Sequence, residues 1–184
     1  VIEQSGHGSV TIGSIEKYIT DVAWEKGWVK KITVIDEKNT SIGIIGSGPA
    51  GLAAAEELRK KGYQITIYDR YDRPGGLLIY GIPNFKLEKD IIKKRISRLK
   101  ESGINFLMDC EIGSSIDFDE VEKKHDALLI ATGVYKSRKI NLNNSDASNV
   151  VPALEFLIAS NKKGLQDDVK DFESGRLDSK GKNV

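Results

Sequence analysis

Hydrophobic residues along this chain recur with two different periods, and the changes between them mark the predicted elements. Near the start, Ile12, Ile15 and Ile19 recur at helical spacing. They predict an amphipathic helix that follows an N-cap at Thr11 and ends near Gly27. The charged segment after it lacks a strong period, and we interpret it as a connector.

The next segments change period within a short distance. Residues 41–45 form an apolar run that predicts a buried strand, and the alanine-rich residues 49–61 predict a helix. Gly62 follows at the position of a C-cap. Residues 63–69, with the sequence YQITIYD, alternate and contain β-branched residues, which predicts a second strand. Strand, glycine turn, helix and strand together predict one βαβ unit.

The second half of the chain continues this alternation. The later predicted elements are a Gly- and Pro-rich loop over 70–85, a helix over 88–102, a strand within 104–112, a buried strand within 126–133 and a helix over 151–160. The remainder is charged and poorly patterned. Strands that alternate with helices predict an α/β fold with a parallel sheet.

Composition restricts the class of protein. Of 184 residues, 30% are charged and 39% are hydrophobic, which is typical of a soluble protein with one domain, or one domain and part of another. The formal net charge of +1 gives no electrostatic reason to expect a nucleic-acid or membrane partner. No apolar stretch is long enough to span a membrane, and no signal peptide is visible. The single cysteine, Cys110, excludes an internal disulfide, so we expect a reducing, cytoplasmic location.

The glycine-rich turn after the first predicted strand carries the clearest chemistry. In GIIGSGPAGLAAAEEL, Gly46, Gly48 and Gly51 fit the pattern G-x-G-x-x-G. The first glycine permits a tight turn, the second lets the backbone approach a pyrophosphate, and the third lets helix and strand pack closely. The phosphates would lie at the N-terminus of the helix. Asp69, at the end of the second predicted strand, is placed to accept hydrogen bonds from ribose hydroxyls.

Two further features favour one dinucleotide over another. The pair Gly75–Gly76 follows the ribose carboxylate, and ALLIATG at 127–133 ends a later strand. In this order the three pieces resemble the FAD-binding half of flavoproteins with two dinucleotide-binding domains, the glutathione-reductase-like class. The resemblance implies a Rossmann-like FAD-binding domain, preceded here by the N-terminal helix. Arg70 resembles a clamp for an NADP 2′-phosphate, but the adjacent Asp69 would repel that phosphate.

A longer stretch narrows the resemblance to one family. GGLLIYGIPNFKL, at 75–87, resembles the segment after the ribose carboxylate in the small (β) subunits of glutamate synthase; the FAD domain of dihydropyrimidine dehydrogenase is related. Residues 9–28 resemble the helix before the FAD domain of those subunits, and residues 151–164 resemble the crossing into their NADPH domain. The resemblance therefore covers nearly the whole chain.

The resemblance implies an electron-transfer oxidoreductase. In that family NADPH reduces FAD, and iron–sulfur clusters carry electrons to the large (α) subunit, where glutamate is formed. We expect this chain alone to be inactive and to contain no catalytic acid, base or nucleophile. Three alternatives remain open: the FAD domain of a paralogous subunit that feeds another reductase, a free-standing NAD(P)-binding domain, and a non-enzymatic regulatory nucleotide-binding module.

Residue by residue, the resemblance implies a set of cofactor contacts. Asp69 stands where the family more often has Glu, and Lys86 where a relative has Arg. The implied contacts are Gly46, Ser47, Gly48, Pro49, Ala50, Gly51, Asp69, Arg70, Gly76, Leu77, Lys86, Ile112, Thr132 and Gly133. Among other residues, Cys110 is predicted to be a core cysteine and His125 to fill a strand edge, and Tyr80 is a candidate to stack on the flavin ring.

The same resemblance predicts how the chain is divided. We expect a helical lead-in over 1–40 as the end of a missing iron–sulfur region, a FAD-binding domain over 41–145, and over 146–184 the crossing into a truncated NADPH-binding domain. The binding sites for the [4Fe-4S] clusters and NADPH would lie outside this chain. Because that last domain is incomplete, we expect residues from Asn161 on to be mobile or held only by neighbouring molecules.

Overall fold

The computed structural model describes residues 6, 8–138, 142–145, 147, 150–178 and 181. These belong to two compact units, Val1–Lys31 and Ile32–Val184. The first unit contains helix α1, Ile12–Glu25, which follows Thr11 as predicted, although the Thr11 side chain makes no capping hydrogen bond. Its residues are all at least partly exposed, so the apolar face predicted from the sequence is not buried within this unit.

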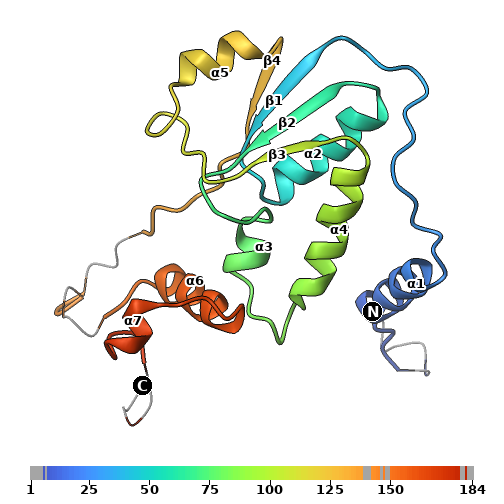
Figure 1. Cartoon of the computed structure of the whole chain (residues 1–184). Coiled ribbons are helices and arrows are strands. Elements are labelled where there is room, and N and C mark those ends of the chain that lie inside the picture. Colours follow the sequence, from blue (N-terminus) through green and yellow to red (C-terminus); the bar gives the residue numbers. More distant parts are fainter. Residues whose placement is uncertain are drawn as a thin grey trace. The chain divides into compact units, whose positions relative to one another are not determined.

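The second unit is built on a four-stranded parallel sheet with the order β3-β2-β1-β4 (Figure 1). The strands are β1, Ser41–Ile45; β2, Gln64–Tyr68; β3, Asn105–Leu107; and β4, Ala127–Ile130. The predicted α/β class and parallel sheet are confirmed. Strand β3 is shorter than its predicted range because Asp109 adopts a left-handed φ of 55°, which interrupts the regular pairing of an extended strand.

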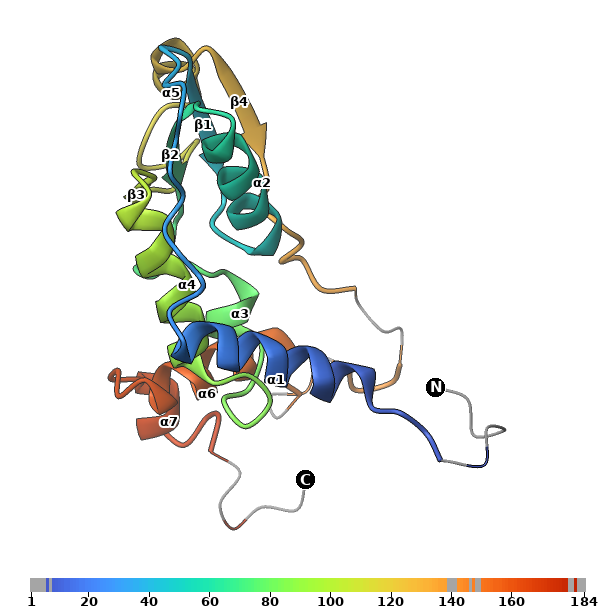
Figure 2. The same ribbon diagram turned by 90° about the vertical axis from the view of Figure 1, so that its right-hand side faces the viewer.

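Helices cover both faces of this sheet. Helix α2, Pro49–Lys60, and helix α4, Lys89–Glu101, lie on one face, and the unpredicted helix α5, Phe118–Lys124, lies on the other (Figures 1 and 2). The change of face has a topological cause. Strand β4 pairs on the opposite side of β1 from β2 and β3, so a right-handed connection to it crosses the other face. None of the helices in the described part of the chain is long and apolar enough to cross a membrane.

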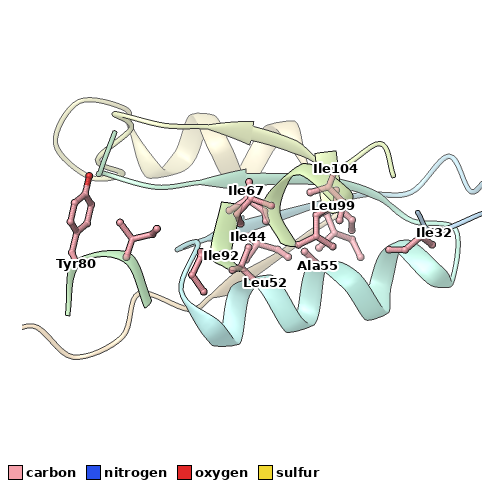
Figure 3. Packing of buried hydrophobic residues seen from close by; sticks show 13 residues of the cluster. Ile32, Ile44, Leu52, Ala55, Ile67, Tyr80, Ile92, Leu99 and Ile104 are labelled. Atoms are coloured by element: carbon pink, nitrogen blue, oxygen red, sulfur yellow. The ribbon is translucent and has the colours of Figure 1, made fainter. Parts of the chain in front are cut away.

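The core lies between the sheet and helices α2 and α4. Ile44 and Ile67, which are fully buried, face Leu52 and Ala55 on α2, and Leu99 of α4 closes the cluster (Figure 3). The β-branched residues of the strands and the small residue on α2 allow close packing of helix on sheet. This rigid layer holds the ends of the strands in place.

The C-terminal segment packs on a short helix that lies within a predicted loop. Helix α3, Leu77–Tyr80, contacts helix α6, Ala153–Gly164, and helix α7, Lys170–Glu173, follows. The Asn161 side chain is buried and donates to the Tyr80 carbonyl at 3.0 Å. The expectation that the segment is mobile from Asn161 on is therefore wrong for the described residues up to 178, because these long-range contacts hold it. Residues 179, 180 and 182–184, which the same expectation covers, lie outside the described residues.

Candidate functional site

A cavity of about 500 Å³ opens where β1, β2 and β4 end. Its position follows from the strand order, because ligands of open parallel sheets bind at the carboxyl ends where that order reverses. Its volume is in the range of small-molecule and cofactor sites. The predicted site residues that line it are Gly46, Gly48, Pro49, Ala50, Asp69, Arg70, Gly76, Leu77, Ile112, Thr132 and Gly133.

The three glycines of the turn have different structural roles. A Cβ at Gly46, where φ is +112°, would lie 2.3 Å from the Ala131 carbonyl oxygen, and a Cβ at Gly51 would lie 1.9 Å from the Gly46 carbonyl oxygen. At both positions, neighbouring backbone atoms thus leave no room for a side chain. At Gly48, with an ordinary φ of −70°, a Cβ would meet no atom within 4 Å. The space beside Gly48 belongs to the cavity, so this glycine keeps open a path for a ligand.

The N-terminus of helix α2 faces the same space. Gly48 is its N-cap, and no side chain accepts a hydrogen bond from the first turn. The first amide N–H groups of a helix have no partner within the helix, and the helix dipole favours negative charge there. Since Gly48, Pro49 and Ala50 line the cavity, this end of α2 is suited to bind an anionic group such as a phosphate.

Ser47 holds the glycine turn against two other segments. Its backbone N–H and its hydroxyl both donate to Asp69 Oδ2, at 2.7 and 2.5 Å. The Gly75 N–H in turn donates to the Ser47 carbonyl at 3.1 Å and lies 3.2 Å from the Ser47 hydroxyl oxygen. Ser47 is fully buried and, like Gly51, does not line the cavity. The structure therefore places Ser47 behind the wall, where it positions Asp69 and Gly75, rather than in direct reach of a ligand.

Asp69 combines a structural role with an accessible edge. Besides the two bonds to Ser47, its Oδ1 accepts from the Tyr71 N–H at 2.9 Å. A carboxylate offers about four acceptor positions, so these three bonds leave one for a ligand. Because Asp69 also lines the cavity, that remaining position suits a hydroxyl donor such as a ribose.

The second glycine segment meets the first at the cavity wall. Gly76 has a φ of +54° and precedes helix α3, and a Cβ there would lie 2.8 Å from the Gly48 Cα. No other residue type could take this position without moving the turn. The prediction of a second close approach of backbone therefore has a geometric basis.

Seven cavity-lining residues were not predicted from the sequence as contacts: Ile45, Tyr68, Tyr71, Cys110, Glu111, Ala131 and Tyr135. Cys110 was predicted to lie in the core, and this is wrong, because it is only half-buried at the cavity wall, where its thiol donates to the Met108 carbonyl. The Arg70 guanidinium carbon lies 4.3 Å from the centre of the Tyr135 ring and 5.1 Å from that of Tyr71. The two rings come from separate segments of the chain, so no local motif could have indicated that both contact Arg70.

Two expected flavin contacts lie away from the cavity. Lys86 is exposed in the turn after α3, where its N–H donates to the Pro83 carbonyl, and it does not line the cavity; its role as a contact stays a prediction. Tyr80 is buried, and its hydroxyl donates to Asp72 and accepts from Arg73. Burial also raises its pKa. Tyr80 therefore has no free face on which a ring could stack.

His125 joins the sheet on the α5 face. Its Nδ1 lies 2.6 Å from the Ser41 hydroxyl and its Nε2 lies 2.9 Å from the Tyr68 hydroxyl. Burial lowers the pKa of His125, and the nearby Lys124 charge lowers it further. A neutral imidazole that connects β1, β2 and the start of β4 fits the structural role predicted for this residue.

Comparison with known proteins gives a consistent result. Residues 40–183 match the pyridine nucleotide-disulphide oxidoreductase family. The whole chain is 54% identical to a glutamate synthase [NADPH] small chain of Azospirillum brasilense, covering 38% of it, and 53% identical to a putative one of Cereibacter sphaeroides, covering 44% of it. The chain thus spans less than half the length of these relatives.

Further similarities concern other oxidoreductases. Over 88% of the chain, 43% of residues are identical to a putative oxidoreductase, AegA, of Escherichia coli, of which the chain covers 25%. Among solved structures, FprA of Mycobacterium tuberculosis in complex with NADPH superposes with a TM-score of 0.62 at 23% identity, over 67% of this chain and 29% of that one. At that identity the superposition supports the fold.

Proposed function

The chain belongs to the pyridine nucleotide-disulphide oxidoreductase family, and from this premise we propose that it is the FAD-binding part of the small chain of an NADPH-dependent glutamate synthase. The observation that carries the proposal is the open side of Gly48, at the N-terminus of α2 and in contact with Gly76. This arrangement leaves room for a diphosphate at a point where amide N–H groups are free to bind it. FAD, when bound, supplies the redox chemistry, while the protein positions it.

Different residues around the cavity would bind different parts of such a ligand. The amide N–H groups of Gly48 and Ala50 would bind the diphosphate, while Pro49, which has no N–H, would only line the path beside it. Asp69 would accept from a ribose hydroxyl through its remaining acceptor position. Ile112 would lie on the adenine side. The other proposed contacts are Gly46, Arg70, Gly76, Leu77, Thr132 and Gly133. Ser47 and Gly51 support this wall from behind.

The rest of the enzyme's activity is proposed for the full-length protein. NADPH would be the electron donor, and the large subunit of glutamate synthase would be the partner that forms glutamate. A single cysteine cannot hold an iron–sulfur cluster, so any cluster of the full-length protein would be bound by residues outside this chain. We propose a cytoplasmic location and no nucleic-acid or membrane partner.

A second function has a specific observation in its favour. The similarity to a putative oxidoreductase of E. coli supports a paralogous subunit that supplies electrons to another reductase. Both proposals require FAD at the same cavity, and they differ only in the partner. An NAD(P)-binding domain or a regulatory module would instead bind FAD weakly or not at all.

Substitution of Gly48 tests the shared part of these proposals. Because a side chain at position 48 would project into open space with an allowed φ, Gly48→Val should fold normally and lose FAD binding. Gly164→Val is a matched control, since Gly164 also has open space but lies at the end of α6. Fluorescence titration with FAD and with NADP, beside thermal melts of both variants, measures the effect. Tighter binding of NADP than of FAD, or unchanged FAD affinity in Gly48→Val, would contradict the proposal.

A further inference from the structure

The loop after β4 brings a tyrosine to the point where the two glycine segments meet. Tyr135 lines the cavity. Its ring atom Cε2 lies 3.6 Å from the Cβ position of Gly133, and its hydroxyl oxygen lies 3.9 Å from the Cβ position of Gly76. Gly76 in turn contacts Gly48. The hydroxyl therefore lies beside the junction of the two glycines.

Neighbouring side chains hold the Tyr135 ring in this position. The Arg70 guanidinium carbon lies over the ring, 4.3 Å from its centre. The Tyr71 ring is 6.0 Å away at a tilt of 42°, and Arg70 is also 3.9 Å from the Glu111 carboxylate. Cation–π and tilted aromatic contacts favour one ring orientation. The position of the hydroxyl is thus determined by a group of side chains and not by the loop alone.

The Tyr135 hydroxyl differs from those of the other tyrosines around the cavity. The Tyr68 hydroxyl bonds with His125, and the Tyr71 hydroxyl accepts from Arg70. Within the described part of the chain, the Tyr135 hydroxyl has no hydrogen-bond partner, although a half-buried tyrosine usually finds one. Burial raises the pKa of Tyr135, so the hydroxyl keeps its proton at neutral pH. It is a donor that faces the cavity and is free to bind a ligand.

We infer that Tyr135 is a cofactor-binding residue whose hydroxyl donates a hydrogen bond to the diphosphate of the bound dinucleotide, at the junction of Gly48 and Gly76. This inference rests on the proposed function, because it needs a diphosphate at the N-terminus of α2. Amides of the α2 turn would bind the anion from one side and the tyrosine hydroxyl from the other. The neutral donor adds a directional side-chain contact to the backbone amides at the N-terminus of α2.

The matched pair Tyr135→Phe and Tyr63→Phe tests this inference in the full chain. Both remove one hydroxyl, but Tyr63 packs beside the core and does not line the cavity. The probes are FAD, ADP and adenosine, titrated by calorimetry. Because a hydrogen bond to a charged group is lost, the affinity of Tyr135→Phe for FAD and for ADP should fall roughly tenfold or more. Its affinity for adenosine should change less than about twofold. Tyr63→Phe should change none of the three, and the melting temperature of empty Tyr135→Phe should equal that of the unsubstituted chain.

Each remaining outcome has a definite meaning. If the unsubstituted chain binds neither FAD nor ADP, the proposed function fails and the inference fails with it. If it binds both and Tyr135→Phe binds them equally well or more tightly, the proposed function stands and the role of Tyr135 is overturned. An equal loss for adenosine and ADP would also overturn it, because the hydroxyl would then not act through the diphosphate.

Discussion

At the scale of single residues, Ser47 links the parts of the cavity wall. It occupies an unremarkable position of the glycine motif, yet its N–H and hydroxyl both bond to Asp69, and Gly75 bonds back to it. One fully buried residue therefore joins the glycine turn to Asp69 and Gly75, which lie 22 and 28 residues further along the chain. A buried hydroxyl with two partners is costly to remove, because its partners lose bonds that water cannot replace.

We predict that Ser47→Ala lowers the free energy of unfolding by about 1–3 kcal/mol and also weakens FAD binding. The second effect arises because Asp69 and Gly75 would each lose the contact with the Ser47 hydroxyl and be held by the Ser47 backbone alone. Ser102→Ala is the control: its hydroxyl is also buried, accepting from the Ile32 N–H and donating to the Arg98 carbonyl, but it is remote from the cavity. Urea denaturation and FAD titration separate the two effects. Equal FAD affinity in both variants would mean that Ser47 contributes to stability alone.

At the scale of elements, polar contacts attach the C-terminal helices to α3. The Arg73 guanidinium forms a bidentate pair with Asp167, at 2.6 and 2.7 Å, and also donates to the Tyr80 hydroxyl. Asn161 of α6 bonds to the Tyr80 carbonyl. Because Gly76 is the N-cap of α3, the helix that follows the second glycine segment is also the one on which α6 packs (Figure 1).

We predict that Arg73→Ala releases α6 and α7 from α3 without unfolding the sheet. A bidentate guanidinium–carboxylate pair is among the stronger polar contacts, and its loss leaves Asp167 without its main partner. Arg176→Ala is the matched control, since Arg176 pairs with Glu155 and Asp171 inside the same segment. Hydrogen exchange of residues 153–173 should become faster in Arg73→Ala and stay slow in Arg176→Ala. Unchanged exchange in both variants would show that apolar packing alone holds the segment.

At the scale of the whole molecule, the chain consists of two compact units of unequal content. The main hydrophobic core and the cavity belong to residues 32–184. We predict that removal of residues 1–29 leaves both the melting temperature and the FAD affinity unchanged. Two residues are kept before Ile32 because its amide N–H donates to Ser102. Thermal melts and FAD titration of the shortened chain test this, and a lower melting temperature would mean that α1 stabilises the larger unit.

Sequence alone determined the features that depend on neighbours along the chain. The period of apolar residues predicted α2, α4 and the strands β1 and β2 to within a few residues, because a buried face requires that spacing. Strand β4 was also placed correctly, but the prediction that it is buried is wrong, because it lies at the edge of the sheet and is largely exposed. The spacing of Gly46, Gly48 and Gly51 predicted a turn open to a diphosphate, since only residues without a Cβ allow it. The family, too, could be recognised from such local motifs.

Only the tertiary structure decided which distant residues come together. Ser47 carries no signal that its hydroxyl will bond to Asp69, and nothing near Tyr135 in the chain indicates that its ring will lie over Arg70 and beside Gly76. The same holds for Asn161, whose partner is a carbonyl on α3. These contacts join segments separated by many residues. Those of Ser47 and Tyr135 exist because the sheet brings the ends of its strands to one edge, and that of Asn161 exists because α6 packs on α3. Local periodicity contains no information about such pairings, so the wall of the cavity is a property of the fold.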